Sequence, residues 1–143
     1  VTHLANMASV LLREEKVADA ERYAQKAFDA FETGRHRQPA PAAAHQRTHV
    51  HAVSGAALNA AGRFEEALTV LLSVTERPPE HPRLLSVVYR LLGIASAGLG
   101  RFDEAKAYYL SALSLAREYN PPGSPFIREL ESMLAGLPGE LEP

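Results

Sequence analysis

The histidines near the middle of the sequence are the side chains best suited to chemistry. His45 and His49 are four residues apart, a spacing that places two imidazoles on one helix face, where they can hold a metal ion. The stretch HQRTH lacks the glutamate of the HExxH pattern, and no acidic residue between Glu32 and Glu65 could complete a ligand set. We therefore predict no metal or cofactor, and a metal-binding sensor or enzyme is the least favoured alternative. His51, on the expected core side, is predicted to be buried and hydrogen-bonded.

Pairs of adjacent carboxylates are the second candidate for chemistry. They are Glu14 and Glu15, Glu65 and Glu66, and Asp103 and Glu104. Each pair falls at an expected turn or helix start, where the helix macrodipole favours negative charge, so none requires a catalytic explanation. The sequence also lacks a glycine-rich phosphate loop, a GxSxG motif and any cysteine, so nothing supplies an activated nucleophile. We predict that the protein is not an enzyme.

Composition and charge argue against nucleic-acid and membrane partners. The formal net charge is -2, and the basic cluster Arg35, His36 and Arg37 lies in a proline-rich connection without interleaved aromatic residues. No apolar run reaches the length of about 18 residues that a membrane helix needs. The absence of cysteine is compatible with a reducing compartment, and we expect a cytoplasmic protein. Because the N-terminus lacks both an initiator methionine and a signal peptide, we interpret the chain as a piece of a larger protein.

The elements that must position these residues are all helical. Alanine and leucine dominate and apolar residues recur at helical spacings, while prolines and glycines mark regular interruptions. We predict helices over about residues 2–14, 17–33, 41–61, 64–76, 82–99, 102–119 and 124–136. Their number and spacing favour three helix pairs followed by a last helix.

Two near-identical heptapeptides reveal an internal repeat. GRFEEAL begins at Gly62 and GRFDEAK begins 38 residues later, at Gly100, and under this shift small residues meet small ones and large apolar residues meet large apolar ones. The N-terminal segment aligns with a shift of 47 residues, which matches Ala20 to Ala67. In this first copy Glu15 replaces the turn glycine, and Ala24 replaces an aromatic residue.

The third copy, LLGIASAGLGRFDEAKAYYLSAL over residues 91–113, resembles a tetratricopeptide repeat. The resemblance covers roughly residues 1–119, with a period longer than that of the family and similar to repeats of bacterial sensor and regulator proteins. The second copy also keeps Pro79 but departs at His51 and Ser54. The residues that carry the repeat signature are Gly55, Gly62, Phe64, Ala67, Gly93, Gly100, Phe102, Ala105, Tyr109 and Ala112.

The resemblance implies an all-α, right-handed α-solenoid of three antiparallel helix pairs. Repeats are expected over about residues 1–38, 41–79 and 82–119, with a C-terminal helix over about 124–136. Within a pair, close approach needs a small residue on each helix, and we expect Gly93 to face Ala105. The apolar stripe of the C-terminal helix, which includes Ile127 and Leu130, predicts a cap over the third pair. The alternatives are a homodimer interface or the start of a fourth repeat.

In tetratricopeptide arrays the first helix of each pair lines a concave groove, and helix phase assigns residues to it. From the second and third repeats these are His49, Ala52, Ala56, Asn59, Val87, Arg90, Ile94 and Ala97, and from the first they are Thr2, Ala5, Ser9 and Leu12. The Lys, Asn and Arg residues of the family's carboxylate clamp are absent from the corresponding positions. We therefore predict a protein- or peptide-binding module of a regulatory or scaffolding protein, which takes a partner helix or an extended apolar peptide. Arg90 and His49 would bind one anionic group, and self-association is the alternative function.

Overall fold

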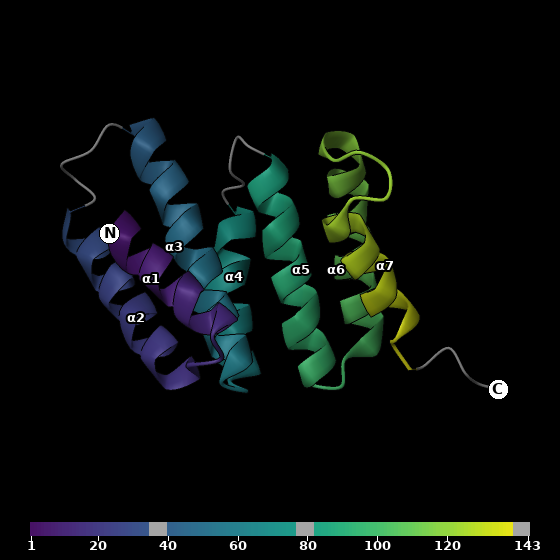
Figure 1. Cartoon of the computed structure of the whole chain (residues 1–143), viewed down its shortest axis with the longest axis horizontal. Coiled ribbons are helices and arrows are strands. Elements are labelled where there is room, and N and C mark those ends of the chain that lie inside the picture. The colour runs from purple at the N-terminus through teal and green to yellow at the C-terminus, as the bar shows by residue number, and fades with distance from the viewer. Residues whose placement is uncertain (35–39, 77–81, 139–143) are drawn as a thin grey trace.

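The computed structural model describes residues 1–34, 40–76 and 82–138, and this part of the chain is helical throughout apart from short connections. The helices are α1 (Thr2–Arg13), α2 (Val17–Gly34), α3 (Ala40–Ala60), α4 (Phe64–Glu76), α5 (Pro82–Gly98), α6 (Phe102–Tyr119) and α7 (Pro125–Ala135) (Figure 1). Each predicted helix agrees with the observed bounds to within one residue at either end. The cluster at residues 35–37, Pro79 and the ends of the first two predicted repeats lie outside the described residues.

The helices stack as consecutive antiparallel pairs in one row, from α1 and α2 at one end to α6 and α7 at the other (Figure 1). We call α1, α3 and α5 the first helices and α2, α4 and α6 the second helices. α3 packs against both α1 and α5, whereas direct contacts between neighbouring second helices are few. The first helices therefore lie on the inner side of the row and the second helices are spread on its outer side.

The turn inside each pair has the same backbone geometry. Gly62 and Gly100 adopt φ values of 78° and 77°, in the left-handed region that glycine enters without a steric penalty. In each turn the next amide donates to a helix carbonyl five residues back, from Arg63 to Leu58 at 2.8 Å and from Arg101 to Ser96 at 2.9 Å. The first pair makes the same turn with Glu15 at φ 60°. The substitution that weakens the first copy in sequence thus leaves the turn intact.

Close approach within a pair depends on a glycine beneath a large side chain. A Cβ atom on Gly93 would collide with the ring of Tyr109, and one on Gly55 would lie 2.5 Å from the side chain of Leu71. The atoms nearest to a Cβ at Gly93 thus belong to Tyr109, one helical turn after Ala105, and the expected contact between Gly93 and Ala105 stays a prediction. Ala105 is fully buried on the same helix.

Among the remaining signature residues the alanines are buried, whereas Phe64 and Phe102 are half-buried. Ala67 and Ala112 have no exposed surface, and the ring of Phe64 lies against Gly98 at the end of α5. The core falls into three clusters of buried residues. The first joins α1, α2 and α3, the second joins α3, α4 and α5, and the third joins α6 and α7. The first is built largely of alanines and includes Ala5, Ala8, Ala24, Ala27, Val53 and Ala57. The other two contain leucines and tyrosines, so they bury larger side chains.

The last helix caps the third pair, as its apolar stripe predicts. Ser124 is the N-cap, with its hydroxyl accepting from the Ile127 amide at 3.4 Å, and Pro125 occupies the first turn. Ile127 and Leu130 are buried against the alanines and Tyr109 of α6. The apolar side of α7 is therefore used within the chain.

Replacing Glu15 with glycine should stabilise the protein. A non-glycine residue in the left-handed region costs roughly 1–2 kcal/mol, partly offset by the greater flexibility of glycine in the unfolded chain. We expect Glu15→Gly to raise the free energy of unfolding by about 0.5–1 kcal/mol in urea denaturation. The matched control is Gly100→Ala, which places a side chain in the same conformation and should lower the free energy of unfolding. A destabilised Glu15→Gly variant would contradict this account of the turn.

Adding one methyl group at Gly93 should destabilise the third pair. The Tyr109 ring is buried and cannot move aside freely, so Gly93→Ala is expected to lower the free energy of unfolding by about 1–3 kcal/mol. Gly34→Ala is the control, because a Cβ atom at that helix end meets no other atom within 4 Å. Equal effects of the two substitutions, measured by thermal unfolding, would show that the contact is not tight.

Candidate protein-interaction surface

The inner face is the stripe of the first helices that their packing leaves partly open. On α5 it comprises Val87, Arg90, Ile94 and Ala97, and on α3 it comprises His49 and Ala56, all of them half-buried. Four of these six side chains are apolar, and His49 and Arg90 are the polar ones, so the inner face has a mostly apolar floor. Six of the eight residues assigned to the concave groove from sequence therefore keep surface that a partner could touch. On α1, Thr2 is exposed and Ser9 and Leu12 are half-buried.

Ala52 and Asn59 occupy the contact between α3 and α5. Ala52 is 5% exposed and Asn59 is 9% exposed. The Asn59 amide donates to the Leu91 carbonyl at 3.0 Å, which joins the two first helices. Neither residue offers useful surface to a partner, and Ala5 of α1 is fully buried in the same manner. Helix periodicity assigned these residues to the groove, but it could not show that the first helices pack closely enough to bury them.

Arg90 is held by the C-terminal helix. Its guanidinium pairs with Glu129 of α7 at 2.8 Å and lies 5.8 Å from the centre of the Phe126 ring. Arg83, two turns earlier on the same stripe, is exposed and has no ion-pair partner within the described residues. Arg83 is therefore the better placed of the two for an external anion. The spacing of Arg83, Val87 and Arg90 puts all three on one helix face, and this spacing could have identified Arg83 as an inner-face residue from the sequence.

Charge is segregated between the two sides of the row. The first helices contain no aspartate or glutamate, and they carry Arg13, Arg47, Arg83 and Arg90. The second helices contain ten acidic and only four basic residues. Because the formal net charge of the chain is only -2, this separation is invisible in the overall composition. Arg47 donates to the Ser73 carbonyl of α4 at 2.9 Å and Arg90 pairs with Glu129, so the positive charge of the inner side comes mainly from Arg83, whereas the outer side is acidic.

Of the α3 histidines, His51 is buried as predicted, whereas His45 is exposed and His49 is half-buried. His51 is buried, its Nδ1 atom lies 2.8 Å from the Arg47 carbonyl, and its ring centre lies 5.1 Å from that of Phe28. Burial lowers the pKa of His51, and the hydrogen bond to Arg47 only partly opposes this effect. Burial and the neighbouring His45 also lower the pKa of His49. No group of three potential metal ligands occurs among the residues that the structure describes.

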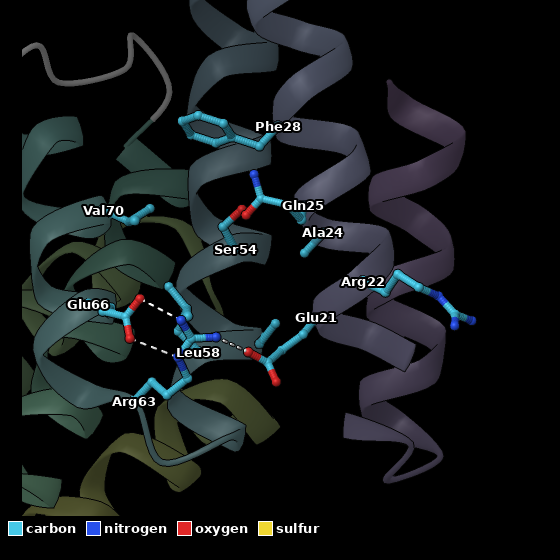
Figure 2. A pocket seen from close by; sticks show the side chains of 11 residues that line it. Glu21, Arg22, Ala24, Gln25, Phe28, Ser54, Leu58, Arg63, Glu66 and Val70 are labelled. Carbon is cyan, nitrogen blue, oxygen red and sulfur yellow. Dashed lines mark hydrogen bonds and ion pairs between the residues drawn. The ribbon is translucent and has the colours of Figure 1, made fainter. Parts of the chain in front are cut away.

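A hollow of about 420 Å³, which we call the seam pocket, lies on the outer side between α2 and α4, with α3 as its floor (Figure 2). Its walls include Ala24, Phe28 and Leu58, and Arg63 lies at one end. The Arg63 guanidinium donates to Glu66 at 2.7 and 2.6 Å and to Glu21 at 2.7 Å. These carboxylates raise the pKa of Arg63. Sequence reasoning missed the seam pocket, because it treated the charges of the heptapeptide only as helix-start residues.

Comparison with known proteins agrees with this architecture. Residues 88–119, which span most of α5 and all of α6, match the tetratricopeptide repeat family. The crystal structure of a tetratricopeptide-like protein from Chlorobium tepidum TLS superposes with a TM-score of 0.68 at 20% sequence identity, covering 94% of this chain and 91% of that chain. No curated protein matches the sequence.

The matched repeat over residues 88–119 and the shared fold are those of a tetratricopeptide-like, all-α solenoid of stacked helix pairs. Solenoids of this kind present extended surfaces on which other proteins bind, and they are typically non-enzymatic. None of the described helices has the length and apolar character required to cross a membrane.

Acidification should destabilise the protein through His51. The pKa of His51 is lowered on folding from 6.5, so below that pH the unfolded chain takes up a proton that the folded chain resists. The free energy of unfolding should therefore fall as the pH drops below 6.5, and should fall less in His51→Gln. Urea denaturation at about pH 7.5 and pH 5.5 measures this difference. His3→Gln, on the exposed side of α1, is the control, and an unchanged pH dependence in His51→Gln would disprove the role of His51.

Proposed function

We propose that the chain is a protein- or peptide-binding module that receives its partner on the inner face. The observation that carries the proposal is the charge segregation, because a row of first helices without a single carboxylate favours an anionic partner. The partly open apolar side chains Val87, Ile94 and Ala97 supply contact area beside this charge. The partner is therefore a helix or extended segment that combines apolar with acidic residues.

One end of the inner face provides an anchor for such a segment. A pocket of about 210 Å³ lies where α5, α6 and α7 meet, and its lining includes Val87, Tyr119 and Phe126. Arg83 lies at this pocket, and Arg90 contacts the Phe126 ring. An apolar side chain of the partner would fill the pocket while a neighbouring carboxylate pairs with Arg83. Such buried apolar anchors account for most of the binding energy in typical interfaces.

Self-association is the alternative proposal for the function. A homodimer through the C-terminal helix has less support, since Ile127 and Leu130 of α7 are already buried against α6. Light scattering over a range of concentrations separates the alternatives, because a monomer throughout excludes an oligomerisation module. The cytoplasmic location and the regulatory or scaffolding parent protein stay predictions from sequence.

Binding should be lost when the inner face is made acidic. We suggest selecting peptides from a random library displayed on phage and measuring the affinity of a selected peptide by calorimetry. Val87→Glu and Arg83→Glu should each weaken binding at least about tenfold. The first puts a charge into the pocket for the apolar side chain, and the second puts a carboxylate beside the partner's acidic residue. The control Leu72→Glu alters an exposed leucine on the outer side and should leave affinity unchanged.

The sign of the charge can be tested separately from the apolar contacts. If Arg83→Glu binds like the original protein while Val87→Glu does not, the inner face binds apolar partners without charge selection. If folded Val87→Glu and Arg83→Glu variants both retain full affinity, the inner face is not the binding surface and the proposal fails.

A further inference from the structure

The seam pocket exists because one junction between repeats has lost its large side chains. The repeat alignment matches Glu21, Ser54 and Val70, around the first junction, with Leu68, Leu92 and Tyr108 around the second. Leu68 and Leu92 are buried in the central core cluster, and Tyr108 packs against it and stacks on Tyr89 with ring centres 6.3 Å apart. The junction between the second and third pairs is thus filled by large side chains, whereas the equivalent junction between the first and second pairs is hollow.

The interior of the seam pocket is apolar with one hydroxyl group. Ala24, Phe28, Ala57 and Leu58 contribute to its lining. Ser54 on the floor is only 8% exposed, and within the described part of the chain its hydroxyl has no hydrogen-bond partner. Figure 2 shows this hydroxyl directed toward the space between α2 and α4. This hydroxyl is open to the seam pocket, so it is available to donate to or accept from a bound group.

One end of the seam pocket is negatively charged. Arg63 lies between Glu21 and Glu66, so the three side chains together carry one net negative charge. Arg22 also borders the seam pocket, but it points away in Figure 2 and pairs with Asp19 at 3.0 Å. Besides Glu66, the α4 helix carries two more acidic residues, Glu65 and Glu76, and no basic one. A cation is therefore favoured at this end over an anion.

We propose that the seam pocket binds a small organic cation with an apolar body, such as an arylalkylamine. Its aromatic ring would pack between Phe28, Leu58 and Val70, and its ammonium group would pair with the carboxylates of Glu21 and Glu66. The volume of about 420 Å³ is within the range of roughly 300–1,000 Å³ that is usual for small-molecule sites. The site lies on the acidic outer side of the row, so it is separate from the inner face and independent of any partner bound there.

Tryptamine is a suitable probe, with uncharged indole and anionic indole acetate as matched compounds. Saturation-transfer NMR and calorimetry should show that tryptamine binds the full chain and that indole acetate does not. Filling the seam pocket with Ser54→Leu or Val70→Tyr, which copy residues of the packed junction, should weaken tryptamine binding at least about tenfold. Glu21→Gln should weaken tryptamine about tenfold and leave indole unchanged, because only the charge is removed. Ser132→Leu, an exposed serine on α7, is the control.

The outcomes separate a binding site from a packing defect. Both filling variants should unfold at the same or a higher temperature than the original protein, which shows that loss of binding is not loss of fold; if Ser54→Leu does not fold, Val70→Tyr carries the test. Undetectable tryptamine binding to the original protein would overturn the proposal and leave the hollow as imperfect packing. Undiminished binding to a folded filling variant would also overturn it.

Discussion

The close contact between the two helices of a pair is the constraint on which the rest of the structure depends. Gly55 beneath Leu71 and Gly93 beneath Tyr109 let the backbones approach, and each large side chain then reaches toward the next pair. Ile127 and Leu130 of α7 pack on Tyr109 in this way, so even the cap is positioned by the same contact. In the first pair Ala24 stands where the other pairs have Leu71 and Tyr109, and there the junction with the following pair is hollow.

The row separates charge because its two kinds of helix meet different neighbours. The first helices pack against one another on the inner side, and a carboxylate among them would have to be buried or lie close to its counterparts on neighbouring helices. The second helices are spread apart, so their acidic residues remain in water and reach the turn arginines of adjacent pairs. Arg63 contacts Glu21, and Arg101 contacts Glu65 at 2.9 Å. These exposed ion pairs contribute little to stability individually. On the inner face Arg90 is paired with Glu129, whereas Arg83 has no ion-pair partner within the described residues.

The fold could be predicted from sequence because its signals are local, whereas the site depends on distant contacts. Helix ends follow from glycine and proline, and the repeat follows from the two heptapeptides. The choice between Ala105 and Tyr109 as the neighbour of Gly93 could not be made, since both lie on the same side of α6. The pairing of Arg90 with Glu129 joins residues 39 positions apart, and only the position of α7 reveals it. The seam pocket was missed because an alanine or serine in an alignment looks like a tolerated substitution and gives no sign of the space it leaves.

The alanine-rich core of the first pair has a consequence for the dynamics of the chain. Alanine buries far less apolar area than leucine or tyrosine, so each helical turn of α1 and α2 contributes less to the cohesion of the row. In a solenoid, where every unit is held only by its neighbours, such a pair is expected to open locally before the others do. Its amide protons would then exchange with solvent faster than those of α5 and α6. One wall of the hollow junction belongs to this pair, so a molecule could enter there by transient fraying without unfolding the remainder of the chain.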